Sequence, residues 1–311
     1  MGSKMSREQW GICSEANLHG LHLFFNTHEG YEPAIREALS QLPALFEEIN
    51  EQFSEAMFSG VVAIGANFWS ELYPDSKPAN LKPFPSMHHE DRHMPAVPVD
   101  LFFQLRSDRH DVNYIASRRL LNLFGEMVEL IEQVPCFRYL DGRDLTGFIK
   151  GTANPKGRLR RKIALIEEPG PFNNGSYVHI QRYRHNINRW QGIPTEEQEL
   201  IIGRYKKDNS RVSQDELPET AHAFRARCFD ANGEPVQLLR QSMPYGNLTT
   251  QGLLFVSYCA NADSFEKILA NMVFGSDAGN YDHLLNYTTA ETGAAFFAPS
   301  IDYLLNQGNV N

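Results

Sequence analysis

The chain has 311 residues, of which 42% are hydrophobic and 22% charged, as is typical of a globular protein with a hydrophobic core. Its 29 Lys and Arg against 38 Asp and Glu leave a formal net charge of -9, which argues against nucleic acid as a partner because phosphate contacts need clustered cations. No apolar run is long enough to cross a membrane, and four cysteines without a metal-ligand spacing are typical of a reducing, cytoplasmic setting.

The first half of the chain has the order strand, helix, strand, strand, helix, strand. Residues 1–12 are expected to be a disordered N-terminal stretch, in which Met1–Lys4 ahead of a second methionine resembles a remnant of cloning. Apolar residues at helical spacing predict a helix over 32–53, with Pro43 as a point where it kinks or splits. Strands are predicted over 16–25, 60–69, 99–107 and 136–141.

A loop and a second helix complete this half. Segment 78–98 is rich in Pro and His and is expected to be an irregular loop. The helix is expected to be capped by Ser107 or Asp108 and to carry one apolar face from Leu120 to Ile131.

The second half repeats this order less clearly. Thr195 and Gln198 form a capping-box pattern that predicts a short helix. A longer amphipathic helix is expected over 263–275, capped by Asp263 or Ser264. Strands are predicted over 176–186, 237–246, 252–260 and 294–300.

Both halves therefore suggest the βαββαβ order of a ferredoxin-like unit. Two such halves predict an α+β protein in which helices pack on the faces of antiparallel sheets, arranged as a dimeric α+β barrel. We place the N-terminal half at 13–150 and the C-terminal half at 151–311.

Two local clusters allow more than one interpretation. His88, His89 and His93 could bind a metal, although histidines in a loose loop usually do not form a closed site. The basic run Lys156–Lys162 fits either a solvated loop or a rim that attracts anions.

Three further residues have a chemical and a structural interpretation. His222 follows a Pro-Glu-Thr lead-in and, taken alone, is more often a structural histidine. Arg240 ends an apolar strand, where a guanidinium needs either a carboxylate partner or an anionic or peroxidic ligand. Asp282 fits either a helix N-cap or a carboxylate that orients a histidine ring.

The stretch DLTGFIKGTANPKG, residues 144–157, places a lysine inside a glycine-framed turn that suits a short side chain. Its GFIKGTANP segment, together with ETAHAFRAR, LLRQSMPYG and GAAFFAPS, resembles the motifs of the dye-decolourising peroxidases of the bacterial B-type group. The motifs stand in the family's order, and the resemblance covers nearly the whole chain. It implies two ferredoxin-like halves and a haem b (iron protoporphyrin IX) pocket built largely by the second.

The resemblance assigns roles residue by residue. His222 matches the proximal ligand of the haem iron, and Asp282 matches the carboxylate behind it. Arg240 matches the distal arginine, and Ser242 a distal polar residue that can hold a water. The other matches contact the cofactor: Arg204 on a propionate, Leu253 and Phe255 on the distal wall, and Gly151 and Thr152 in the loop of the first motif.

Lys150 stands where the family has its distal aspartate. A protonated lysine has no lone pair with which to accept the proton of peroxide, so the resemblance implies slowed peroxide activation. Burial and the like charge of Arg240 would both favour the neutral amine. Three states of Lys150 remain open: it turns outward to a propionate, stays protonated and recruits an anion, or becomes neutral and binds the iron.

The implied activity is the reduction of hydrogen peroxide through an oxoferryl haem, coupled to the oxidation of bulky dyes, phenols or porphyrinogens. Tyr183, Trp190 and Tyr205 are candidate relays for electrons from such reductants. A homo-oligomer is expected, because homo-oligomers are common in the family. The alternatives are a haem-binding or haem-delivery protein with little turnover, and a ferredoxin-like protein without a cofactor.

Overall fold

The computed structural model of the chain describes residues 6–276 and 279–308. The main elements of its N-terminal half are β1 (His19–Thr27), α1 (Glu32–Gln52), β2 (Ser59–Gly65), β5 (Leu101–Ser107), α3 (His110–Phe124) and β6 (Val128–Phe137). β1 pairs with β5 on one side and with β6 on the other, and β2 pairs with the far edge of β5. All three pairings are antiparallel, so this half is a ferredoxin-like sheet.

The C-terminal half repeats the arrangement. Its main elements are β7 (Ser176–His185), β8 (Leu239–Arg240), β9 (Met243–Gly246), β10 (Gln251–Cys259), α8 (Asp263–Phe274) and β12 (Ala294–Ala298). β7 lies between β12 and β10, and both β8 and β9 pair with the other edge of β10. β8 and β9 keep one register along β10, so they are one strand that is interrupted at Gln241 and Ser242.

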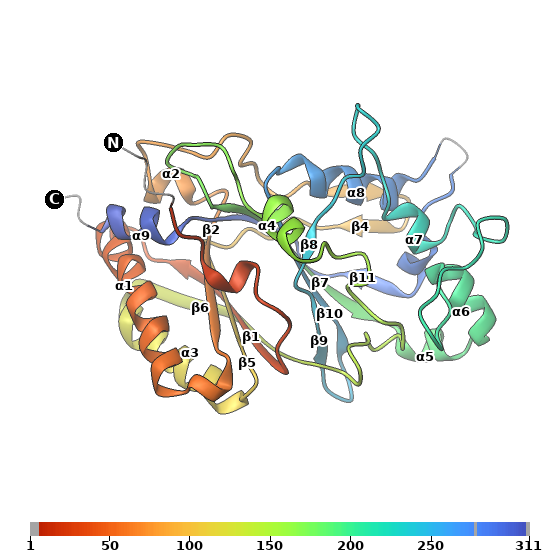
Figure 1. Cartoon of the computed structure of the whole chain (residues 1–311), viewed down its shortest axis with the longest axis horizontal. Coiled ribbons are helices and arrows are strands. Elements are labelled where there is room, and N and C mark those ends of the chain that lie inside the picture. The colour runs from red at the N-terminus through yellow and green to blue at the C-terminus, as the bar shows by residue number, and fades with distance from the viewer. Residues whose placement is uncertain (1–5, 277–278, 309–311) are drawn as a thin grey trace.

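The two sheets join at both edges and close into a barrel. β2 pairs with β12, and β6 pairs with β9. The result is a ten-stranded sheet in which β7 also pairs with β10, and every pairing is antiparallel. α1 and α3 cover one end of the molecule and α8 lies toward the other (Figure 1). The edge strands of each half find their hydrogen-bond partners in the other half, so the two halves form one closed sheet.

Shorter elements connect these strands. Three small helices, α5 to α7, come between β7 and β8 and lie at the right of the molecule, opposite both chain ends (Figure 1). The remaining elements are α2 (Trp69–Leu72), β3 (Met87–His89), β4 (Arg92–Met94), α4 (Arg158–Ala164), α5 (Ile187–Gln191), α6 (Thr195–Ile202), α7 (His222–Arg225), β11 (Thr288–Ala290) and α9 (Ile301–Gln307).

The alternation of side chains along the strands separates two cores. One fills the barrel interior and includes Phe102, Val256 and Tyr258. The other lies between the outer faces of the sheets and the helices, and includes Leu39 of α1 and Phe265 of α8. Within the described residues, no helix is long and apolar enough to span a membrane.

The structure corrects several expectations for the first half. α1 continues through Pro43 without a break. Segment 78–98 contains the hairpin β3–β4, which a Pro- and His-rich sequence did not suggest. α3 begins after Arg109, without a side-chain cap from Ser107 or Asp108, and Ile131 belongs to β6 rather than to the helix.

Caps and boundaries also differ in the second half and at the N-terminus. α6 follows Pro194 without a capping box, and α8 follows Ala262 without a side-chain cap. Residues 6–12 are ordered rather than disordered: Gln9 is buried and hydrogen-bonds both Val62 and the carbonyl of Pro299. Met1–Lys4 lie outside the described residues.

Candidate haem site

The central feature of the site is a histidine paired with a buried carboxylate. The Nδ1 atom of His222, the first residue of α7, lies 2.6 Å from Oδ2 of Asp282. Asp282 is fully buried, whereas the His222 side chain is 36% exposed. Its Nε2 atom has no hydrogen-bond partner among the described residues. This nitrogen is therefore available to bind a metal, and the carboxylate fixes the ring that carries it.

Asp282 is held in place by the backbone on both sides. Its N–H donates to the carbonyl of Met272 at 2.9 Å, near the end of α8. Its Oδ1 atom accepts the N–H of Leu284 at 3.0 Å, so the carboxylate also caps a short 3₁₀ helix. The next residue, His283, donates its N–H to the carbonyl of Thr220, two positions before the site histidine. Both interpretations of Asp282 from the sequence, the cap and the orienting carboxylate, therefore describe the structure.

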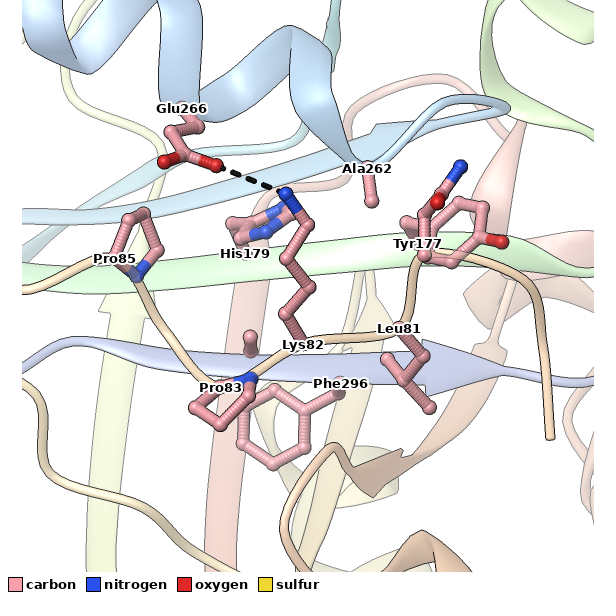
Figure 2. Close-up of a pocket in the computed structure, with 11 residues that line it drawn as sticks. Leu81, Lys82, Pro83, Pro85, Tyr177, His179, Ala262, Glu266 and Phe296 are labelled. Atoms are coloured by element: carbon pink, nitrogen blue, oxygen red, sulfur yellow. Dashed lines mark hydrogen bonds and ion pairs between the residues drawn. The ribbon is translucent and has the colours of Figure 1, made fainter.

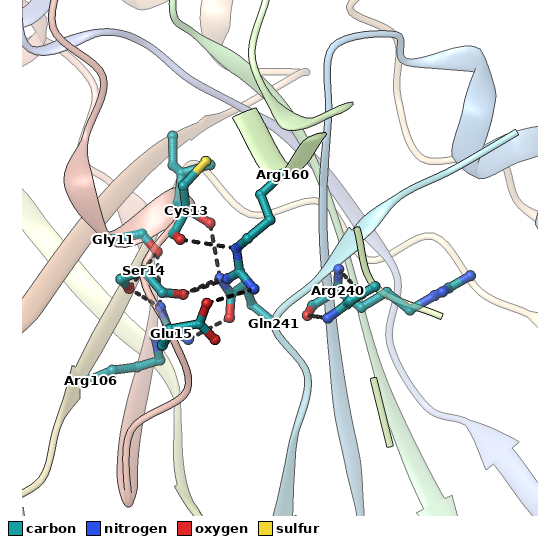
Figure 3. Close-up of polar contacts among 10 residues, drawn as sticks. Gly11, Cys13, Ser14, Glu15, Arg106, Arg160, Arg240 and Gln241 are labelled. Carbon is teal, nitrogen blue, oxygen red and sulfur yellow. Dashed lines mark hydrogen bonds and ion pairs between the residues drawn. The ribbon is translucent and has the colours of Figure 1, made fainter. Parts of the chain in front are cut away.

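Arg240 lies on the outer face of the C-terminal sheet. It stands opposite Ser257 across the β8–β10 pair, whereas its neighbour Leu239 is packed in the barrel interior. Its side chain extends away from those of Gln241 and Arg106 (Figure 3). Among the described residues, no hydrogen bond or ion pair reaches the guanidinium, and burial lowers its pKa. A half-buried cation without a protein partner is suited to an anionic or polar ligand.

The first motif is attached directly to this arginine. The side-chain amide of Asn154 donates to the carbonyl of Arg240 at 2.7 Å, and its Oδ1 atom accepts the N–H of the same residue at 2.9 Å. The loop that carries Lys150 is thus clamped to the strand that carries Arg240. The turn before the clamp passes through Gly151 with φ +70°, a conformation that favours glycine.

Three of the predicted distal residues share the face of Arg240. Strand alternation places Ser242, Leu253 and Phe255 on the same outer side, and all three are half-buried. The hydroxyl of Ser242 accepts the N–H of Val256 at 3.2 Å, which bridges the interruption between β8 and β9. Phe255 packs near Phe265 of α8, with ring centroids 5.9 Å apart. The sheet therefore forms an apolar wall with one cation and one hydroxyl.

α7 and its histidine lie over the same side of the sheet. Asn271 of α8 donates to the carbonyl of Arg225 in α7 at 2.6 Å, and α8 itself covers the outer face. Tyr183, on that face of β7, is near enough to Asp282 for the carboxylate to raise its pKa, in addition to the larger effect of burial. The His222–Asp282 pair and the wall around Arg240 therefore belong to one region.

Lys150 is half-buried and makes no side-chain hydrogen bond or ion pair with the described residues. Burial lowers its pKa, the charge of Asp144 opposes that shift, and Arg138 adds to it. The Asp144 carboxylate is engaged elsewhere: it lies 3.1 Å from Nε2 of His185 and accepts from Thr146 at 2.9 Å. The like charge comes mainly from Arg138 rather than from Arg240, which differs from the sequence expectation.

Thr152 and Arg204 are brought together through a third residue. Asn209 donates its side-chain amide to the Thr152 hydroxyl at 2.7 Å, and its carbonyl accepts from Arg204 at 2.9 Å. The pKa of Arg204 is lowered by burial and by Arg211. A cationic edge thus borders the loop of the first motif, as an anionic group on a ligand would require.

The residues present fit a haem. An imidazole nitrogen without a partner, a carboxylate behind it and an unpaired, half-buried guanidinium form the donor set of a haem peroxidase site. The histidine cluster of the hairpin does not form a second metal site. Over residues 6–276 and 279–308, no group of three or more His, Cys, Asp or Glu side chains could hold a metal ion.

Two other features do not belong to this site. The basic run forms α4, in which Arg160 donates to the carbonyls of Cys13 and Ser14 and so anchors the N-terminal segment (Figure 3). A small hollow beside His179 is crossed by the ion pair of Lys82 with Glu266 at 3.3 Å (Figure 2). Neither feature contacts the proximal pair.

The comparisons with known proteins show the family of the chain. Residues 9–138 match the N-terminal domain of the Dyp-type peroxidases, and residues 141–303 match their C-terminal domain. The chain belongs to the Dyp-type peroxidase family, whose cofactor is haem. The two matches meet near the end of β6, about ten residues before the boundary expected from the sequence.

Characterised relatives and solved structures cover almost the whole chain. The dye-decolorizing peroxidase of Rhodococcus erythropolis is 33% identical over 91% of this chain and 84% of its own length, and that of Mycobacterium tuberculosis is 34% identical over 88% and 82%. A Dyp-type peroxidase structure from Shewanella oneidensis is 47% identical, with a TM-score of 0.95 over 97% of this chain and 99% of that one. DyPB of Rhodococcus jostii RHA1 is 32% identical, with a TM-score of 0.90 over 94% and 96%.

Sequence reasoning missed two residues that shape this site. The motif alone assigns no role to Asn154, although an Asn-Pro pair after a glycine turn is a signal for a side chain that bonds nearby backbone. The sequence suggests Tyr183 only as an electron relay, because its position beside Asp282 depends on the pairing of distant strands.

Proposed function

We propose that this protein is a haem-dependent peroxidase that reduces hydrogen peroxide and oxidises bulky dyes, phenols or porphyrinogens, and that Lys150 slows its reaction with peroxide. The observation that carries the proposal is the 2.6 Å contact between His222 Nδ1 and the buried Asp282 carboxylate. When bound, haem supplies the iron at which peroxide is reduced; His222 would hold it through Nε2.

On the proximal side, Asp282 accepts the Nδ1 proton of His222 and gives the ring partial imidazolate character. This raises the electron density that Nε2 can donate and favours high oxidation states of a bound metal. Because the carboxylate is fully buried, water does not weaken the hydrogen bond.

On the distal side, Arg240 is the group that can stabilise negative charge on a peroxide oxygen. Its guanidinium is a fixed fork of donors and is engaged by no other described residue. The hydroxyl of Ser242 accepts from the backbone of Val256, which leaves its proton free for a donated hydrogen bond to a water or ligand.

Lys150 lacks the property that the distal acid provides. Hydrogen peroxide must lose a proton from one oxygen and gain a proton on the other, and a carboxylate can carry that proton. An ammonium group has no lone pair for this purpose. Burial lowers the pKa of Lys150 and so favours the neutral amine, whereas the charge of Asp144 opposes this shift, and neither form is the carboxylate that the family has at this position. Of its three open states, we favour the one in which the amine turns away from the peroxide, since its strongest charge neighbours are Asp144 and Arg138.

The test is the rate at which the Soret band changes when peroxide is mixed with haem-loaded protein. Lys150→Asp should raise the second-order rate constant by about 100-fold, a typical contribution of a positioned acid–base group. Lys150→Asn is the matched control, because it removes the cation without adding a base. Equal rates for Lys150→Asp and the unchanged chain would contradict the proposed impairment.

A haem-binding or haem-delivery protein with little turnover is the second candidate. It is favoured by the missing distal acid and by a shorter similarity to the Escherichia coli deferrochelatase, 27% identical over 143 residues and 37% of this chain. Bleaching of an anthraquinone dye with peroxide, together with a peroxide-induced change of the Soret band, favours the peroxidase. A Soret band that peroxide leaves unchanged favours the carrier.

We further propose a route for electrons and a cellular setting. Of the three aromatic candidates, Tyr205 is 39% exposed, whereas Trp190 and Tyr183 are buried, so Tyr205 is the one that a bulky reductant can reach. All four cysteines are free, which is consistent with a reducing cytoplasm. The family resemblance leads us to propose a homo-oligomer, which sedimentation of the purified protein would test.

A further inference from the structure

The hairpin β3–β4 carries a buried arginine that the activity proposed above does not use. The side chain of Arg92 is only 6% exposed, although it stands in a Pro- and His-rich connection of the N-terminal half. Its charge is balanced on the outside by Glu90, at 2.9 Å, while His89 approaches Nη2 at 2.7 Å. A buried and fully partnered guanidinium is a rigid group with a fixed direction.

The inner side of Arg92 contacts the segment that carries Asp282. Its guanidinium carbon lies 3.7 Å from the centre of the Tyr281 ring, close enough for a strong cation–π contact. Its Nε atom donates to the carbonyl of Val273 at 3.0 Å, in the last turn of α8. That last turn has no basic residue of its own, so Arg92 supplies the cation that a helix C-terminus favours.

Both contacts lead directly to the proximal carboxylate. Tyr281 directly precedes Asp282 in the sequence. The Tyr281 hydroxyl donates to Oδ1 of Asn286 at 2.8 Å, which closes the turn that contains Asp282. The carbonyl of Met272, next to the one that Arg92 binds, accepts the N–H of Asp282. Arg92 therefore contacts both the end of α8 and the ring of Tyr281, the two features that position the Asp282 carboxylate.

We propose that Arg92, together with the ring of Tyr281, is a positioning residue that fixes Asp282 against Nδ1 of His222. The N-terminal half thereby contributes to the proximal side of a pocket that otherwise belongs to the C-terminal half. The inference rests on the proposed haem function, in which His222 binds the iron and Asp282 tunes it. Arg92 acts through Asp282 and His222 and contacts neither of them directly.

The test uses the haem-loaded full chain and two substitutions that break the contact from either side. Arg92→Gln removes the cation, and Tyr281→Leu removes the ring. Each should weaken haem affinity by about tenfold, the lower end of what groups behind a metal ligand contribute. Each should also raise the Fe(III)/Fe(II) reduction potential, because a less well-placed Asp282 leaves less negative charge on His222.

Two further variants control for effects on folding. Tyr281→Phe keeps the ring on which Arg92 stacks, and its potential should stay close to that of the unchanged chain. Arg36→Gln removes another arginine that binds a backbone carbonyl, that of Leu72 at 2.8 Å, within the N-terminal half. It should lower thermal stability and leave the potential unchanged.

The outcomes separate this inference from the proposed function. If Arg92→Gln lowers only the melting temperature, with unchanged potential and haem affinity, Arg92 is a structural residue and the inference is wrong. Asp282→Asn provides the reference: if it also leaves potential and affinity unchanged, the proposed role of the proximal pair fails instead. Support requires that Asp282→Asn, Arg92→Gln and Tyr281→Leu shift the potential in the same direction.

Discussion

The carboxylate of Asp282 is the most constrained side chain of the site. It is fully buried and is held by two hydrogen bonds, one to His222 and one to the N–H of Leu284. Removing one partner of a buried charged pair leaves the other without compensation. The pair is therefore expected to act as a unit, both in holding a metal and in setting its electron density.

The first expectation concerns this pair. Asp282→Asn keeps the size of the side chain but removes its charge, and should weaken haem affinity by about 10- to 100-fold. The measurement is the transfer rate of haem to an excess of apomyoglobin. A second variant, Asp263→Asn, changes an exposed carboxylate of α8 that pairs with Lys82 and should leave the transfer rate unchanged. Equal transfer rates for both variants would show that Asp282 does not support the ligand.

The distal arginine gives a second expectation. Arg240→Leu should lower the rate of the peroxide reaction by about 100- to 1,000-fold, the usual effect of removing one preorganised donor. Haem affinity should change little, because the proposed bond to the iron comes from His222 and not from Arg240. Arg240→Lys keeps the positive charge but loses the forked set of donors, so its rate of reaction with peroxide should lie between those of Arg240→Leu and the unchanged chain. A Soret change with peroxide that is as fast in Arg240→Leu as in the unchanged chain would rule out this role.

Between elements, the contact of the first-motif loop with β8 is the most specific. Asn154 is bonded to both backbone groups of Arg240, so it fixes the loop of Lys150 relative to the arginine. Asn154→Ala should destabilise the folded state by about 1–3 kcal/mol, because two partly buried backbone groups lose their partner. Unfolding in urea measures this loss. Thr152→Ala is the control, because it removes an exposed hydrogen bond of the same loop. If Thr152→Ala lowers the free energy of unfolding as much as Asn154→Ala does, Asn154 has no special role in fixing the loop to β8.

The elements show what local sequence can and cannot predict. β7 and β10 are predicted nearly to their ends, because β-branched and aromatic residues recur along both strands. The hairpin β3–β4 was missed because its stability comes from Arg92 and its contacts with α8, residues about 180 positions away. Predicted caps failed for α3, α6 and α8, since tertiary packing rather than a capping side chain begins each helix.

The family motifs indicate the candidate site residues and the pairing of His222 with Asp282, but not how the two sheets join around them. Family motifs pointed to His222, Arg240 and Asp282, and the structure brings the first and last into contact. No local pattern indicates that β6 pairs with β9 and β2 with β12, because those edges meet only when both sheets have formed. The sequence therefore predicts an α+β barrel as a class of fold, but not which edge strands pair to close it.

For the molecule as a whole, two buried histidines predict sensitivity to acid. Burial lowers the pKa of His22 and of His179 to about 3, with smaller contributions from Arg106 and Lys82 respectively. The unfolded chain binds these protons below about pH 6.5, whereas the folded chain excludes them until about pH 3. The free energy of unfolding is therefore unaffected by these two histidines above about pH 6.5, and it decreases as the pH falls from 6.5 toward 3.

The size of the effect can be measured by urea unfolding of the holoprotein. Each histidine should cost roughly 3 kcal/mol at pH 4 relative to pH 7. His22→Leu should lower the proton uptake on unfolding by one near pH 5. His28→Leu, at an exposed position, is the control. A slope of stability against pH that is the same in His22→Leu and in the unchanged chain would contradict this assignment.

The account depends most on a bond from His222 to haem iron, and one titration tests it directly. Hemin is added to the unchanged chain, to His222→Ala, and to His283→Ala, a neighbouring histidine whose ring packs on Tyr281. We predict a stoichiometric complex with a Soret band for the unchanged chain and for His283→Ala, and loss of that complex in His222→Ala. If His222→Ala takes up one haem per chain with the same spectrum, the proximal ligand is not His222 and the account is wrong.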